Sequence, residues 1–172
     1  MTGVPTARRA GPRDAEAIIA IFDAVARTSP WLIYVPGQRR PDEIEGALVE
    51  SASLTTYWVA PADGLPVAAL EMAQSGLPAL SHTSSFGMAV LPSAQRRGFG
   101  RALIRASEAW ALAHGVCKVS IVCAAGNTPA LALYQECGYV LEGRQKRHFR
   151  LQGRLVDALV LAHFIREDAH ES

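Results

Sequence analysis

The chain has 172 residues, of which 49% are hydrophobic and 19% charged, and its formal net charge is +1. This balance is typical of a globular protein with one core, and it argues against a disordered or fibrous chain. The near-neutral charge disfavours nucleic-acid binding. The chain also contains no run of about 18 apolar residues that could span a membrane. We therefore predict a single domain over residues 1–172.

The N-terminal half predicts two helices followed by a β-hairpin. A short strand over residues 6–10 leads into a helix, because Pro12 suits a first helical turn. The apolar positions of this helix are spaced three and four apart: Ile18, Ile21, Phe22 and Val25. A second helix is expected after a loop over residues 31–40. Three of its residues should face the core: Ile44, Leu48 and Val49. Strands over residues 55–60 and 67–73 flank the turn signal Asp63-Gly64.

The C-terminal half predicts an alternation of strands and helices. Its strands fall at residues 83–90, 116–123, 139–150 and 155–164, and its helices at residues 98–114 and 128–137. The strand at 116–123 is apolar enough to be buried on both faces. The long helix carries an apolar stripe: Phe99, Leu103, Ala106, Trp110 and Ala113. Together the elements predict an α/β fold in which helices cover a mixed sheet.

A glycine- and arginine-rich turn joins the strand at 83–90 to the long helix. A helix N-terminus exposes unpaired N–H groups and a partial positive charge, so it attracts phosphate. Gly98 and Gly100 would let the backbone approach closely. Three arginines would add charge-assisted hydrogen bonds: Arg96, Arg97 and Arg101. The turn lacks the lysine of a P-loop and the third glycine of a dinucleotide fold. A purely structural turn stays an alternative.

Two stretches carry a family resemblance. The turn fits the coenzyme A signature Gln/Arg-x-x-Gly-x-Gly/Ala of the GNAT superfamily of N-acetyltransferases over six residues: Gln95, Arg96, Arg97, Gly98, Phe99 and Gly100. The second GNAT pattern, Asn-x-x-Ala-x-x-Leu-Tyr-x-x-x-Gly-Phe/Tyr, is matched at each fixed position: Asn127, Ala130, Leu133, Tyr134, Gly138 and Tyr139. The chain thus resembles the family strongly over residues 83–164, and only in general layout before them.

The resemblance implies a fold and a donor. The fold is the GNAT fold, a mixed, mostly antiparallel sheet of about seven strands with about four flanking helices. The donor is acetyl-CoA, whose pantetheine arm lies beside a splayed strand at Met88, Ala89 and Val90. Amides of residues 96–101 would hold the pyrophosphate, and Asn127 and Ala130 would line the arm.

Acetyl transfer to an amine needs a base and an acid. An alkyl ammonium, with a pKa of about 10.4, must lose a proton, and the leaving thiolate must gain one. The resemblance puts Tyr134 at the thioester sulfur as the acid, although a core tyrosine is the alternative. Glu71 is the candidate base, because it interrupts an apolar strand; alternatively it faces solvent or pairs with an arginine. His82 is the second candidate.

The loop at 31–40 combines aromatic and basic residues that suit a small amino acid. Trp31 and Tyr34 offer ring surface and Arg39 offers a partner for a carboxylate, while a hydrophobic staple is the alternative. With Glu71 and His82, the two aromatic residues form the predicted substrate site. Residues 142–159 are also similar to the GNAT branch that contains L-amino-acid and small-amine acetyltransferases.

We therefore expect an N-acetyltransferase for a small-molecule amine. The alternatives are a protein N-terminal or lysine acetyltransferase and a non-catalytic acyl-CoA-binding module. The resemblance adds a homodimer as a further expectation. Neither a secretory signal nor metal-ligand spacing is visible, and three cysteines without Cys-x-x-Cys spacing read as buried thiols: Cys117, Cys123 and Cys137. A cytoplasmic protein without a metal or nucleic-acid partner is expected.

Overall fold

The computed structural model describes residues 4–50 and 54–166. Within them one seven-stranded sheet runs in the order β1-β2-β3-β4-β5-β7-β6, and β4 and β5 are its parallel pair. The strands are β1 (Arg8–Arg9), β2 (Thr55–Ala62), β3 (Leu65–Gln74), β4 (Thr83–Val90), β5 (Lys118–Ala124), β6 (Val140–Leu151) and β7 (Arg154–Phe164). The other neighbours are antiparallel. The predicted mixed, mostly antiparallel sheet is confirmed.

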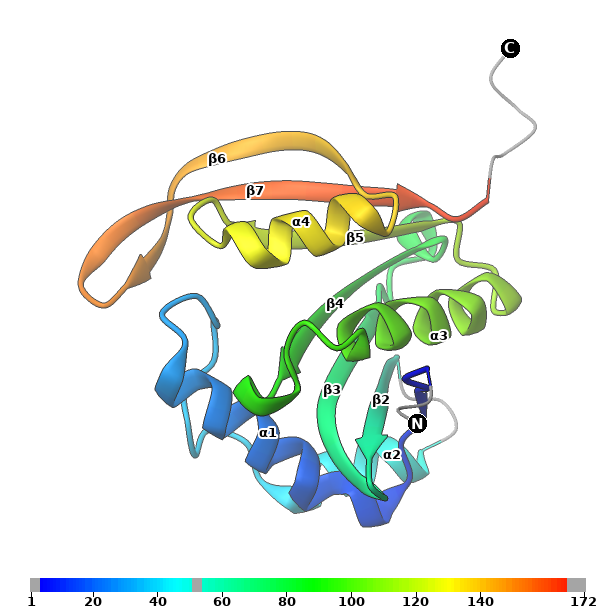
Figure 1. Cartoon of the computed structure of the whole chain (residues 1–172). Helices are drawn as coiled ribbons and strands as arrows, with labels where there is room; N and C mark the ends of the chain where they lie inside the picture. Colours follow the sequence, from blue (N-terminus) through cyan, green and yellow to red (C-terminus); the bar gives the residue numbers. More distant parts are fainter. Residues whose placement is uncertain (1–3, 51–53, 167–172) are drawn as a thin grey trace.

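Helices cover both faces of the sheet (Figure 1). One face carries α1 (Ala15–Thr28) and α2 (Pro41–Val49), and the other carries α3 (Phe99–Ala113) and α4 (Thr128–Glu136). Because side chains alternate along a strand, β3 sends Leu70 and Met72 toward α3 but Ala69 toward α1. Among the described residues no helix is long and apolar enough to cross a membrane.

The α1 face contains the core that the helical spacing predicts. Ile18, Ile21, Phe22 and Val25 are all buried against α2 and the sheet. The helix starts later than predicted, because residues Pro12–Asp14 form a short 3-10 turn first. Asp14 is buried there and accepts two hydrogen bonds from the Arg8 guanidinium, at 2.7 and 2.9 Å. This pair ties the start of α1 to the edge strand β1.

Three burial predictions are wrong, because the residues lie where the described elements leave them exposed to solvent. Val49 at the end of α2 is 70% exposed, and Ala113 at the end of α3 is also exposed. The core side of α3 instead includes Ile104 and Ala111. Val122 of β5 is 41% exposed, so β5 is not buried on both faces. The α1 helix contacts β3 and β4, which leaves the same face of β5 open.

The hairpins follow their turn residues. Asp63 and Gly64, with φ of 49° and 82°, form the tight β2–β3 turn. The long β6–β7 hairpin ends the sheet and projects beyond the helices (Figure 1). Its register slips between Gln145 and Phe149, where Asp157 accepts hydrogen bonds from Arg144 Nε and from the Arg147 backbone N–H, each at 2.8 Å. The charged residues of β6 lie on this outer edge strand.

Candidate active site

A gap opens between β4 and β5. Their parallel register covers three residue pairs, from Thr83 opposite Lys118 to Ser85 opposite Ser120. Both strands continue beyond these pairs, β4 to Val90 and β5 to Ala124. The two strands therefore splay toward their C-terminal ends, where β4 turns into α3 and β5 turns into α4.

The backbone of β4 presents polar groups to this gap. Leu91 N–H donates to Val67 O at 3.0 Å, in line with the β3–β4 register that sets Ala89 opposite Ala69. Residues of an antiparallel strand alternate between bonding one neighbour and facing away from it. Met88 and Val90 thus direct their N–H and C=O groups at the gap, and Val90 O accepts a bond from Gln95 Nε2 at 3.1 Å.

Ala89 does not fit the predicted role. The same alternation gives its peptide groups to β3, and its side chain is buried beneath α1. Its contribution is to hold the strand in place while its two neighbours face the gap.

The turn after β4 places the N-terminus of α3 beside the gap. Gly98 has a φ of 91°, a left-handed conformation that favours glycine, and Arg96 also has a positive φ of 59°. The first bond of α3 runs from Ala102 N–H to Gly98 O at 3.0 Å. The N–H groups of residues 99–101 precede that bond, so they form the positive end of the helix dipole.

The other predicted residues of this turn have side-chain partners. The Arg97 guanidinium lies 5.3 Å from the ring centroid of Phe99, and Arg101 forms an ion pair with Glu136 of α4. A Cβ on Gly100 would lie 2.9 Å from Leu133 Cδ2 and 3.4 Å from Met88 Cε. Gly100 therefore permits close packing of α3 against α4 and β4, a reason the sequence did not show.

Helix α4 borders the gap from the β5 side. Asn127 is its N-cap, and Asn127 Oδ1 accepts a bond from Ala130 N–H at 3.4 Å. The amide nitrogen of Asn127 remains able to donate. Tyr134 is buried, with its ring centroid 5.8 Å from that of Phe86 on β4. Burial raises the pKa of the Tyr134 hydroxyl, which keeps its proton throughout the physiological range.

Glu71 lies on the opposite face of the sheet and forms an ion pair with Arg39 from the loop between α1 and α2. The same guanidinium donates to Tyr57 Oη at 3.4 Å and lies 5.8 Å from the Tyr34 ring centroid. Burial, with the charge of Glu71, raises the pKa of Tyr57 to about 12. The alternative of an arginine partner for Glu71 is therefore realised. Beside Glu71, a Cβ on Gly87 would meet nothing within 4 Å, so open space adjoins the carboxylate.

Trp31 lies across the wide end of the gap. Its indole ring occupies the space where Gly126, just after β5, would carry a Cβ: the nearest ring atom would be 2.5 Å away. Tyr34 instead packs on α1, with its ring centroid 5.5 Å from that of Phe22. The two aromatic residues of the predicted substrate loop thus point to different neighbours.

Comparison with known proteins identifies the family. The family model described as the acetyltransferase (GNAT) family matches residues 19–139. This chain belongs to the GNAT acetyltransferase family. It is therefore an acyltransferase, and the resemblance in its two motifs is confirmed. No curated protein matches the sequence.

Solved structures share the GNAT fold at low identity. An acetyltransferase of the GNAT family from Streptococcus pneumoniae superposes with a TM-score of 0.84 at 21% identity, over 92% of this chain and 98% of that one. A putative acetyltransferase from Salmonella typhimurium, solved with its cofactor acetyl-CoA, gives 0.86 at 17% identity over 99% of each chain. A phosphinothricin acetyltransferase from Sinorhizobium meliloti, in complex with acetyl-CoA, gives 0.82 at 18% identity, over 94% and 88%.

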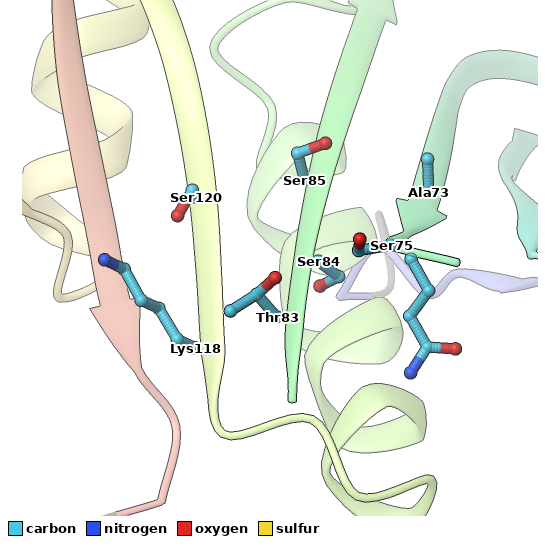
Figure 2. A pocket seen from close by; sticks show the side chains of 8 residues that line it. Ala73, Ser75, Thr83, Ser84, Ser85, Lys118 and Ser120 are labelled. Atoms are coloured by element: carbon cyan, nitrogen blue, oxygen red, sulfur yellow. The ribbon is translucent and has the colours of Figure 1, made fainter. Parts of the chain in front are cut away.

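His82 lies away from the gap in this GNAT domain. It is exposed and precedes β4 at the end where β4 and β5 still pair, and its carbonyl oxygen accepts a bond from Cys117 N–H at 2.8 Å. Near it, a polar hollow of about 280 Å³ is lined by residues of three strands (Figure 2). Lys118 and Ser120 of β5 are the register partners of Thr83 and Ser85 of β4 there. The structure does not bring His82 to Glu71 or Tyr134.

A polar cluster behind Tyr134 was missed by the sequence analysis. The Tyr139 hydroxyl donates to Glu108 Oε1 at 2.7 Å, and His163 Nδ1 lies 2.9 Å from the same oxygen. The Tyr139 ring centroid is 5.9 Å from that of Tyr134. These residues come from α3, β7 and the α4–β6 turn, so no local pattern connects them. In the described part of the chain, no group of three or more His, Cys, Asp or Glu could hold a metal ion.

Proposed function

We propose that this chain transfers the acetyl group of acetyl-CoA to the primary amine of a small molecule, such as an amino acid. One observation carries the proposal: β4 and β5 splay beside the N-terminus of α3, and the peptide groups of Met88 and Val90 face the gap. Backbone groups without a strand partner need another hydrogen-bonding partner. Gln95 Nε2 supplies one for Val90 O, and an amide-bearing arm would supply others.

The residues around the gap suit such a donor from end to end. The N–H groups at the start of α3, with Arg96 and Arg97, would hold the pyrophosphate. Met88 and Val90 would pair with the pantetheine amides, and the Asn127 amide would donate to a carbonyl of the same arm. Acetyl-CoA supplies an activated acetyl group at this place.

The protein's part in the reaction is proton transfer and charge stabilisation. As the amine nitrogen bonds to the carbonyl carbon, Glu71 would take the proton that the amine loses, directly or through water. The carbon–sulfur bond breaks, and the Tyr134 hydroxyl, still protonated because burial raises its pKa, would donate to the departing sulfur. Backbone N–H groups on β4 would stabilise the negative charge on the carbonyl oxygen.

The ion pair between Arg39 and Glu71 favours an acceptor that carries a carboxylate. In the free protein the guanidinium of Arg39 occupies the carboxylate of Glu71. A second carboxylate, on the acceptor, would give Arg39 another partner and leave Glu71 free to take a proton. An α-amino acid has its amine and its carboxylate at the short separation that this arrangement needs.

The wider setting is also part of the proposal. We propose that residues 1–172 act as one domain in the cytoplasm, with no nucleic-acid or membrane partner. The exposed outer strand β6 is the candidate surface for a homodimer.

Thiol release from acetyl-CoA tests the proposal with a panel of amino acids, polyamines, aminoglycosides and short peptides. We expect turnover with amino acids, and a loss of about 100-fold in Tyr134→Phe at unchanged acetyl-CoA affinity. Product masses would confirm N-acetylation. Coenzyme A binding without transfer to any amine would contradict the proposed reaction, and failure to bind coenzyme A would contradict the assignment of the gap.

A further inference from the structure

Gly126 is a glycine because of Trp31. A Cβ at this position would lie 2.5 Å from Trp31 Cη2, 2.9 Å from Cζ3 and 3.2 Å from Cζ2. Real Cβ atoms do not approach other atoms that closely, and here the obstacle is a rigid ring. The backbone of Gly126 does not need glycine, since its φ lies outside the left-handed region. Position 126 is therefore shaped to receive the indole.

The contact joins the two sides of the gap. Trp31 belongs to the segment after α1, whose neighbours Leu32 and Tyr34 pack on the cluster under α1. Gly126 belongs to the turn between β5 and α4. Ala124 lies four residues past the last β4–β5 pair, about 13 Å along the strand. The indole therefore crosses at the open end of the gap, away from the paired end.

The surroundings hold the segment in this place. The backbone N–H of Trp31 donates to Ser29 Oγ at 3.2 Å. At the far end of the same loop, Arg39 forms its ion pair with Glu71. On its other side the segment borders the tip of the β6–β7 hairpin, where both line a hollow of about 260 Å³ that includes Arg150 and Gln152. Figure 1 shows this loop reaching up from α1 toward the turn that begins α4.

We infer that Trp31 is a specificity-determining residue that closes the α1 side of the gap and restricts the acceptor to small amines. The inference rests on the proposed function. The loop lies against Gly126 through Trp31 and against Glu71 through Arg39, so a small amino acid would fit beneath it, whereas the N-terminus of a folded protein would not. The same cover keeps water from the thioester, which limits hydrolysis to acetate and coenzyme A.

The test compares three variants with a matched control. Trp31→Ala removes the cover, Trp31→Phe keeps a ring, and Gly126→Ala displaces the indole from the other side. Gly143→Ala is the control, because its Cβ would meet nothing within 4 Å and its φ is not left-handed. The first readout is the ratio of kcat/KM for a tripeptide with a free α-amine to kcat/KM for the corresponding free amino acid.

We expect this ratio to rise about tenfold or more in Trp31→Ala and Gly126→Ala, less in Trp31→Phe, and not in Gly143→Ala. Thiol release without any amine should also rise in the first two variants. The second readout needs no turnover: calorimetric titration of the same amines into each variant saturated with coenzyme A. The tripeptide should bind Trp31→Ala and Gly126→Ala more tightly than it binds the wild type.

An unchanged ratio, with unchanged tripeptide binding, would overturn the inference and reduce Trp31 to a packing residue of the loop. If Trp31→Ala does not fold, Trp31→Phe and Gly126→Ala decide the matter by the same two readouts. Failure of the proposed function looks different, because the wild type would then acetylate no amine in the panel.

Discussion

Under the proposed function, the two faces of the sheet would bind their ligands by different means. On the α3–α4 face, the gap is lined by backbone groups and helix ends from two short continuous segments, residues 83–101 and 127–139. On the α1 face, the candidate acceptor site consists of contacts between residues far apart in the chain: the Trp31 ring lies against Gly126, and Arg39 pairs with Glu71. A site built from the backbone of a short segment can be recognised as a sequence motif. A site built from distant residues cannot be recognised until their partners are known.

The largest expected effect is a loss of activity from a change on the proposed acceptor side alone. Glu71→Gln removes the proposed base but preserves the shape of the side chain, so kcat/KM for the amine should fall about 100-fold. Acetyl-CoA affinity should stay the same, because the donor side is untouched. Steady-state kinetics together with calorimetric binding of acetyl-CoA separates the two effects.

Glu142→Gln serves as the control for that change. Glu142 also forms an ion pair, with Lys118 at 2.7 Å, but at the paired end of the strands. Full activity in Glu71→Gln would mean that this carboxylate only anchors the loop through Arg39.

The next effect concerns the anchoring of the α1 face rather than its chemistry. Asp14→Asn leaves the Arg8 guanidinium without its charged partner, and we expect a loss of about 2 kcal/mol in the free energy of unfolding. Asp42→Asn should change little, since the Arg40–Asp42 pair is exposed. Urea unfolding measures both.

The pH dependence gives the sign of the Asp14 effect. Hydrogen bonding from Arg8 is the main reason that the pKa of Asp14 is lowered in the folded state. The stabilisation is therefore present above the unfolded pKa, about 3.9, and is lost as the pH falls through the lower folded value. The difference between wild type and Asp14→Asn should shrink below pH 4, and a constant difference would contradict the assignment.

A smaller effect is expected from a substitution on the proposed donor side. Gly98→Ala forces a side chain into a left-handed conformation, which costs about 1 kcal/mol, and should weaken acetyl-CoA binding about fivefold to tenfold. Gly64→Ala imposes similar strain in the β2–β3 turn, where a Cβ would meet nothing within 4 Å. It should lower thermal stability without changing acetyl-CoA affinity. Equal affinity losses in both variants would show that the effect is general strain.

The last comparison, which needs strongly alkaline pH, concerns the tyrosines of the two faces. Burial raises the pKa of Tyr34 and Tyr57, on the α1 face, to about 12, and raises those of Tyr134 and Tyr139 on the other face as well. Unfolded tyrosines ionise near pH 10, so folding stability should fall as the pH rises from about 10 to 12. Absorbance at about 295 nm should show little phenolate in the native protein at pH 10.5, and a native tyrosine with a midpoint near 10 would contradict this.

Much of the fold was predictable because its signals are local. The bounds of β4, the turn at Asp63 and Gly64, and the start of α4 after Asn127 follow from short-range backbone preferences. The family resemblance pointed to Met88 and Val90, and the β3–β4 register explains why their peptide groups face the gap. The sequence alone was therefore sufficient for the order of elements and the GNAT family, and it supplied the residues proposed for the donor half of the site.

The tertiary structure decided which distant residues meet. Val49 and Val122 are apolar in the sequence but exposed, because no element of residues 4–50 and 54–166 covers them. The residues next to Gly126 in the sequence do not predict its contact with the Trp31 ring. Those next to Glu108 do not predict its contacts with Tyr139 and His163. Periodicity and turn chemistry act over a few residues, whereas packing joins segments far apart in the chain. The proposal for the acceptor half of the site therefore depends on contacts that only the folded chain makes.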